Sequence, residues 1–107
     1  MRILFDQGTP VPLRRALDGH EVTTAFEQQW GTLQNGELLR AAEAAGFEVI
    51  VTTDQNLRYQ QNLADRKLAI LVLLTTDWRL IRQQTDTVVQ AVNQLAPGSF
   101  VELPFPP

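Results

Sequence analysis

Uninterrupted apolar segments constrain the fold of this chain most strongly, and the clearest is LAILVLL at residues 68–74. A strand with one face in water alternates apolar and polar residues, whereas a strand covered on both faces is apolar throughout. Shorter segments rich in β-branched and aromatic residues recur along the chain. The sequence therefore predicts strands at residues 3–5, 22–26, 49–53, 69–74 and 100–103.

Residues at helical spacing lie between these strands. They are Leu13 and Leu17, then Leu38, Ala42 and Ala45, and then Ile81, Thr85, Val88, Val92 and Leu95. Residues 55–67 fit a further helix less closely. The alternation predicts a single α/β domain over residues 1–107, with a parallel five-stranded sheet and helices on both faces. Right-handed crossovers favour the strand order 2-1-3-4-5, in which the first and third strands are neighbours.

Composition excludes several classes of protein. A net charge of −3 disfavours unguided binding to nucleic acid, so a polyanion would need a local basic patch or a bound cation. The absence of cysteine rules out disulfides, thiolate zinc sites and thiol catalysis. No apolar segment approaches the roughly 20 residues that span a bilayer, and the N-terminal segment lacks the hydrophobic stretch of a secretory signal. We therefore expect a cytoplasmic protein without membrane association.

Acidic residues follow the first four predicted strands. In a parallel sheet every junction from strand to helix lies at the same edge, so these side chains should share one rim: Asp6, Glu37, Asp54 and Asp77. Helix capping is the alternative for the last three, because acids are favoured in a first helical turn. Asp6 is not needed as a cap, since Thr9 and Pro10 provide a more natural helix start.

Convergence of these acids would require a cation. Two carboxylates about 5 Å apart repel by roughly 3 kcal/mol at an effective dielectric near 20. If Asp6, Glu37 and Asp54 converge, a bound ion removes that repulsion, and oxygen ligands without nearby sulfur or imidazole select Mg²⁺ or Mn²⁺. The single histidine, His20, is predicted at the opposite edge of the sheet, in a structural or solvated role.

Two segments carry a family resemblance. The patterns ILFDQGTP and NGELLRAAEAAGFEVIVTTDQNL resemble the short bacterial PIN-like domains, which are related to the toxin nucleases of toxin-antitoxin systems. The resemblance implies a PIN-like fold and a Mg²⁺- or Mn²⁺-dependent endoribonuclease that a partner antitoxin neutralises. By matching position, Asp6 and Asp54 would be catalytic metal ligands and Glu37 a further catalytic acid that binds metal. Asp77 matches more loosely as another metal ligand.

The chain also departs from this pattern. Amides stand where such domains often have acids, at Gln7, Asn35 and Asn56. Each amide removes a negative charge, which predicts weaker metal binding and leaves open a catalytically degenerate, protein-binding PIN-like module. A receiver-like phosphoacceptor domain is a third alternative. An adjacent acid pair after the first strand and a lysine after the fifth are typical of receivers, and this chain has neither.

Three side chains near the acidic rim are predicted to bind substrate. Arg14 and Arg58 could steer a phosphate backbone, and Tyr59 could stack on a base; exposure to solvent and packing on a helix are their alternatives. Trp30, in the segment after the second strand, either anchors a partner or folds back onto the core. The expected partners are single-stranded or structured RNA, a protein antitoxin and a second copy of the chain.

Overall fold

The computed structural model describes residues 1–33, 35–57 and 66–107. Its five strands form one parallel sheet in the order β2-β1-β3-β4-β5. The strands are β1 (Arg2–Phe5), β2 (Glu21–Thr24), β3 (Val49–Thr52), β4 (Ala69–Leu73) and β5 (Phe100–Leu103). The predicted α/β class, the parallel sheet and the strand order are therefore confirmed. The predicted second strand is too long, because β2 ends at Thr24 and not at residue 26.

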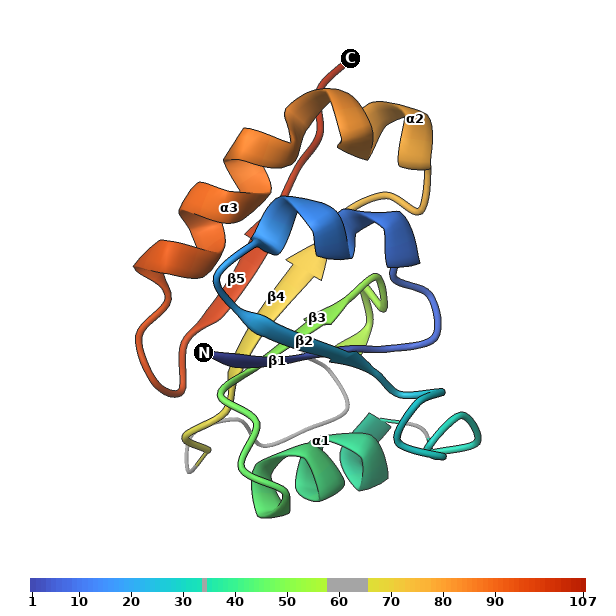
Figure 1. Cartoon of the computed structure of the whole chain (residues 1–107), viewed down its shortest axis with the longest axis vertical. Coiled ribbons are helices and arrows are strands. Elements are labelled where there is room, and N and C mark those ends of the chain that lie inside the picture. Colours follow the sequence, from blue (N-terminus) through green and yellow to red (C-terminus); the bar gives the residue numbers. More distant parts are fainter. Residues whose placement is uncertain (34, 58–65) are drawn as a thin grey trace.

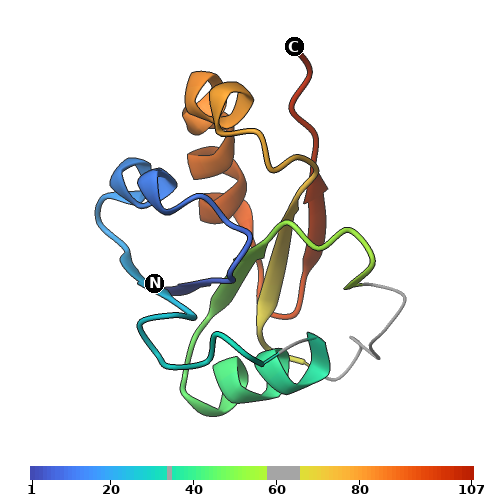
Figure 2. The ribbon, with the colours of Figure 1, turned by 90° about the vertical axis from the view of Figure 1, so that its right-hand side faces the viewer.

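Helices cover both faces of the sheet (Figures 1 and 2). On one side lie the 3₁₀ helix η1 (Val11–Leu17) and the consecutive helices α2 (Trp78–Ile81), η3 (Arg82–Gln84) and α3 (Thr85–Gln94). On the other side lies α1 (Asn35–Ala44). The helix predicted from Ile81 to Leu95 is thus divided at η3, and most of the helix predicted at residues 55–67 lies outside the described residues.

Two apolar clusters explain why the central strands are apolar throughout. Ile3 and Phe5 of β1 point into the cluster beneath η1 and α3, whereas Leu4 points into the cluster beneath α1. Every residue of β3 and β4 is buried. Since alternate side chains enter opposite layers, these positions are apolar except for Thr52 at the end of β3, whose hydroxyl is hydrogen-bonded.

The amino-terminal edge of the sheet is held by hydrogen bonds of His20. His20 lies there as predicted, with Nδ1 at 3.2 Å from the amino terminus and Nε2 at 3.1 Å from the Asn93 side-chain oxygen. Gly46 ends α1 with a φ of 87°, a left-handed conformation that glycine adopts without strain. In the described part of the chain, no helix has the length and apolar character needed to cross a membrane.

Candidate active site

The candidate site lies beyond the carboxyl ends of β1 and β3. Phe5 pairs with Val51 in the parallel register, and the Asp6 amide continues the ladder by donating to the Val51 carbonyl at 3.1 Å. From β1 the chain moves to β2 on one side, and it later returns to β3 on the other side. This change of direction is the topological switch point, where open parallel sheets usually bind ligands.

Asp6 is held by hydrogen bonds to both carboxylate oxygens. Its Oδ1 accepts from the Gly8 amide at 3.2 Å and lies 2.8 Å from the Thr9 hydroxyl, and its Oδ2 accepts from the Thr52 hydroxyl. Burial raises the pKa of Asp6, the three hydrogen bonds oppose that rise, and the negative charge of Asp54 adds to it. The net direction is upward, so the folded protein favours the neutral carboxyl more than solvent does.

The Thr9 hydroxyl faces two acceptors at this site. Its oxygen lies 2.8 Å from Asp6 Oδ1 and also 2.8 Å from the Val51 carbonyl oxygen. A hydroxyl has a single hydrogen to donate. Asp6 and the Val51 carbonyl therefore share this donor, so Thr9 stabilises the Asp6 carboxylate only in part.

Thr52 connects the two aspartates that the sequence predicted to meet. The hydroxyl of Thr52 donates to Asp6 and accepts from the Asp54 amide at 3.1 Å. The Asp54 carboxylate in turn accepts from the Asn56 amide at 3.0 Å. Thr52 is only 2% exposed, so this connection is shielded from water. The Thr52 hydroxyl thus joins the Asp6 carboxylate to the backbone of Asp54.

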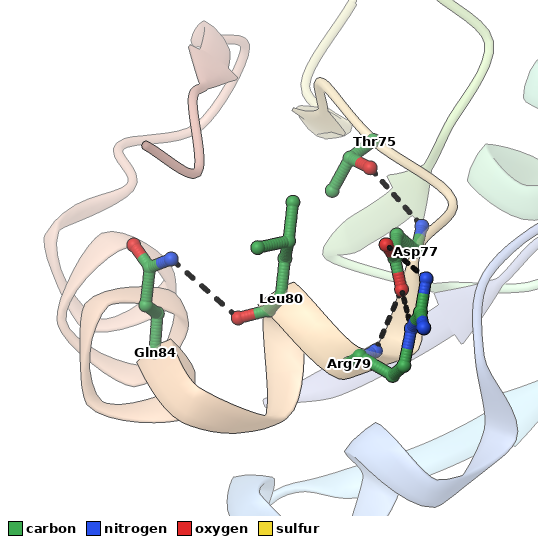
Figure 3. Close-up of polar contacts among 5 residues, drawn as sticks. All are labelled: Thr75, Asp77, Arg79, Leu80 and Gln84. Carbon is green, nitrogen blue, oxygen red and sulfur yellow. Dashed lines mark hydrogen bonds and ion pairs between the residues drawn. The ribbon is translucent and has the colours of Figure 1, made fainter. Parts of the chain in front are cut away.

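Asp77 belongs to a helix cap. Its Oδ1 accepts from the Arg79 amide at 2.9 Å, and the Arg79 guanidinium lies 3.4 Å from the same oxygen (Figure 3). These contacts to Arg79 lower the pKa of Asp77. The capping alternative therefore accounts for its position at the start of α2.

The triplet Thr-Thr-Asp occurs twice and forms the same turn each time. In residues 52–54 and in residues 75–77, the first threonine hydroxyl accepts from the aspartate amide, at 3.1 and 3.0 Å. Each aspartate then accepts from the amide two residues further on. The two turns differ in their partners, because Thr52 contacts Asp6 whereas Asp77 pairs with Arg79. The repeated triplet was a sequence signal that the strand-end analysis missed.

Glu37 does not join the aspartate pair. It lies exposed in the first turn of α1, and within residues 1–33, 35–57 and 66–107 no three acidic or histidine side chains form a group that could hold a metal ion. Mg²⁺ often uses only one or two carboxylates and completes its shell with water and substrate phosphate. Asp6 and Asp54 fit that smaller donor set, because one of the four lone-pair positions of Asp6 is not used by the three hydrogen bonds described above.

Gln7 has a role as a hydrogen-bond donor that a carboxylate cannot fill. Its Nε2 lies 3.3, 2.7 and 3.3 Å from the carbonyl oxygens of Trp30, Gly31 and Leu33. A carboxylate here would face three acceptors without a hydrogen to donate. The departure from the acid-rich pattern at this position is therefore explained by the loop after β2, which Gln7 fastens to the end of β1.

Arg14 lies in a hollow of about 370 Å³ that Asp6 and Thr9 also line. It forms a two-pronged ion pair with Glu27, at 2.9 and 3.2 Å. The Arg14 Nε is buried and has no hydrogen-bond partner among the described residues. The predicted substrate-binding residues Arg58 and Tyr59 lie outside the described residues.

The loop after β2 presents a different aromatic residue from the predicted one. Trp30 folds back onto the core and makes an edge-to-face contact with Phe47, with ring centroids 6.1 Å apart. Phe26, which the sequence placed at the end of a strand, is 83% exposed. The question of whether Trp30 anchors a partner is thus decided in favour of core packing.

In comparisons with known proteins, no family model, curated protein or solved structure matches this chain. Parallel α/β sheets support many unrelated activities, so the fold by itself does not identify one. Function is therefore inferred from the chemistry of Asp6, Thr52 and Asp54.

Proposed function

We propose that this chain is a Mg²⁺- or Mn²⁺-dependent endoribonuclease of the PIN-like type, with its active site at Asp6 and Asp54. The observation that carries the proposal is the Thr52 hydroxyl, which joins both aspartates at the switch point of the sheet. A ligand site at this place is common in parallel α/β folds. Asp6 and Asp54 each offer a negatively charged oxygen ligand, which is the kind of ligand that a hard cation such as Mg²⁺ prefers.

Each group around the pair has a role in this proposal. A divalent ion bound there would lower the pKa of a bound water and polarise a phosphoryl oxygen. Asp6 and Asp54 would hold the ion, and Thr52 would keep the Asp6 carboxylate in place. Arg14, which is paired with Glu27, would lie beside a phosphate in the neighbouring hollow and offset the charge of that acid. By the same resemblance, we propose a toxin of a toxin-antitoxin pair, with a protein antitoxin as its partner.

The test is cleavage of labelled single-stranded RNA by the purified protein with Mg²⁺, with Mn²⁺ and with EDTA. We expect cation-dependent cleavage that falls at least about a hundredfold in Asp6→Asn and in Asp54→Asn, the scale of losses when a group that stabilises the transition state is removed. Asp77→Asn is the matched control, because it removes an equal charge from a helix cap. Cleavage in EDTA, or full activity in both site variants, would refute the proposal.

A catalytically inactive module is the second candidate. It is favoured by the absence, within the described residues, of a third acid that could hold a metal together with Asp6 and Asp54. The two candidates differ in cation binding, because a protein that binds Mn²⁺ only when folded melts at a higher temperature in its presence. No cleavage and no Mn²⁺-dependent shift in melting temperature would favour the inactive module.

A further inference from the structure

Phe26 is the most exposed large apolar side chain in the described part of the chain. It is 83% exposed, compared with 54% for Val11, 38% for Met1 and 36% for Val101. None of the other exposed large apolar residues in that part is aromatic. An aromatic ring in water forgoes the stabilisation that its burial would give, so its position calls for an explanation.

The backbone around Phe26 is fastened at several points. The Ala25 amide donates to Phe5 of β1, and the Trp30 amide donates back to Ala25, both at 2.8 Å. Thr24 and Glu27 form a reciprocal pair, in which each backbone amide donates to the other side chain, at 2.9 and 3.0 Å. The exposed ring therefore stands on a loop with a defined shape.

That shape includes one strained residue. Gln29 has a φ of 64°, a left-handed conformation that is uncommon for residues other than glycine, and its amide donates to the Phe26 carbonyl at 3.0 Å. Gln7 holds the far end of the same loop through three carbonyls. Strain of this kind persists where surrounding contacts determine the backbone, and such positions cluster at ligand sites.

Phe26 stands between two hollows. The first, of about 370 Å³, contains Asp6 and Arg14 of the proposed active site. The second, of about 500 Å³, is lined by Phe26 and by the polar loop residues Glu27, Gln29, Gly31 and Thr32. Phe26 thus shares one hollow with Asp6 and lines a second hollow as well.

We propose that Phe26 is a stacking platform for an unpaired nucleobase of RNA bound across the Asp6 and Asp54 site. This inference rests on the proposed function and adds a binding residue to it. A base has an apolar face and a polar edge, which matches an exposed ring whose hollows are lined, apart from Val11 and Gly31, by polar or charged residues. Aromatic anchors in protein interfaces more often lie in well-packed, desolvated pockets.

The acid next to the ring is neutralised. The Glu27 carboxylate is paired with the Arg14 guanidinium and the Thr24 amide. Stacking is tolerant of sequence, because every base has a π-face, and it requires a base that is free of its complement. Phe26 therefore favours single-stranded over duplex RNA without selecting one base.

Binding of a fluorescein-labelled, unstructured RNA of about twelve nucleotides tests the platform, with Ca²⁺ in place of Mg²⁺ so that a divalent cation is present. We expect Phe26→Ala to weaken binding about tenfold and Phe26→Trp to retain it, since base stacking on an aromatic is lost in the first and kept in the second. Val101→Ala is the matched control, because Val101 is an exposed apolar residue on the edge strand β5. In cleavage assays, Phe26→Ala should raise KM by a similar factor and leave kcat unchanged.

A set of RNAs that each lack one base locates the contact. At one position, removal of the base should weaken binding by the wild-type protein about tenfold and binding by Phe26→Ala hardly at all. Equal losses in both proteins at every position would overturn the stacking role, even if cleavage needs Asp6 and Asp54. If removal of one base weakens binding by the wild type but not by Phe26→Ala, and the protein never cleaves RNA, the stacking role is supported and the nuclease proposal is refuted. Unchanged RNA affinity in Phe26→Ala, with altered self-association, would assign the ring to a protein interface.

Discussion

The hydroxyl group of Thr52 donates a hydrogen bond to the carboxylate of Asp6 and so joins the ends of two neighbouring strands. The same oxygen accepts from the Asp54 amide. A hydroxyl can make both contacts because it is a donor and an acceptor at once. This arrangement lets the fold keep a partly buried Asp6 beside Asp54, since hydrogen bonds oppose the cost of burial.

Thr52→Val should disrupt this arrangement while preserving side-chain shape. Asp6 and the Asp54 amide would each lose a partner in a buried site, so we expect a loss of about 1–3 kcal/mol in the free energy of unfolding, together with weaker Mn²⁺ binding. Urea denaturation and calorimetry measure the two effects. Thr75→Val is the control. Thr75 accepts from the Asp77 amide in the equivalent turn at residues 75–77, and it contacts no carboxylate there. Equal losses in both variants would mean that the Asp6 contact contributes nothing.

Asp6→Asn should stabilise the cation-free protein at neutral pH. The folded state raises the pKa of Asp6 above its ordinary value of 3.8, so folded chains bind more protons than unfolded chains between the two pKa values. Stability of the wild type therefore falls as pH rises through that window and stays lower above it. Asparagine does not ionise, so Asp6→Asn escapes this loss of stability.

Melting temperatures in EDTA across pH 4 to 8 check this prediction. The advantage of Asp6→Asn over the wild type should be largest near pH 8 and shrink as the pH falls and Asp6 becomes protonated. Asp77→Asn should show no such advantage, because the Arg79 contacts lower the pKa of Asp77. A constant difference between Asp6→Asn and the wild type at all these pH values would show that Asp6 does not titrate abnormally.

Asp77 should prove to be a cap and not a metal ligand. Asp77→Ala removes the acceptor of the Arg79 amide, so it should lower the melting temperature, whereas Asp77→Asn keeps an acceptor oxygen and should change it little. Neither variant should alter Mn²⁺ affinity. Calorimetric titration with Mn²⁺ provides the measurement, and a weaker affinity in Asp77→Asn would return this residue to the metal site.

Strand positions were predictable because a strand that is buried on both faces is apolar at nearly every position in the sequence. Residues 69–73 are apolar at every position and form the fully buried β4. The placement of Asp6 and Asp54 followed from the same reasoning, since parallel strands bring their carboxyl ends to one edge. The boundary of β2 was less predictable, because the chain turns after Thr24 in a loop closed by reciprocal contacts between Thr24 and Glu27, which strand periodicity does not encode.

The roles of individual polar residues were harder to predict. An acid that opens a helix has the same sequence signature whether it caps the helix or binds a cation, and only the Arg79 contacts separate the two for Asp77. Gln7 was interpreted as a weakened acid, yet its amide contacts residues more than twenty positions away. Its nearest contact, with Gly31, depends on the path of a loop, which local patterns do not determine.

Gln7→Glu should destabilise the loop that carries Phe26. The substitution preserves side-chain size but replaces a donor with a charged acceptor opposite the Trp30, Gly31 and Leu33 carbonyls. We expect a loss of roughly 1–2 kcal/mol in the free energy of unfolding at pH 7, with partial recovery at acidic pH, where a protonated glutamate can donate one hydrogen bond. Gln90→Glu adds the same charge on the exposed face of α3 and serves as the control. Equal stability of the two variants, with tighter Mn²⁺ binding in Gln7→Glu, would show that position 7 faces the cation and that the carbonyl contacts are dispensable.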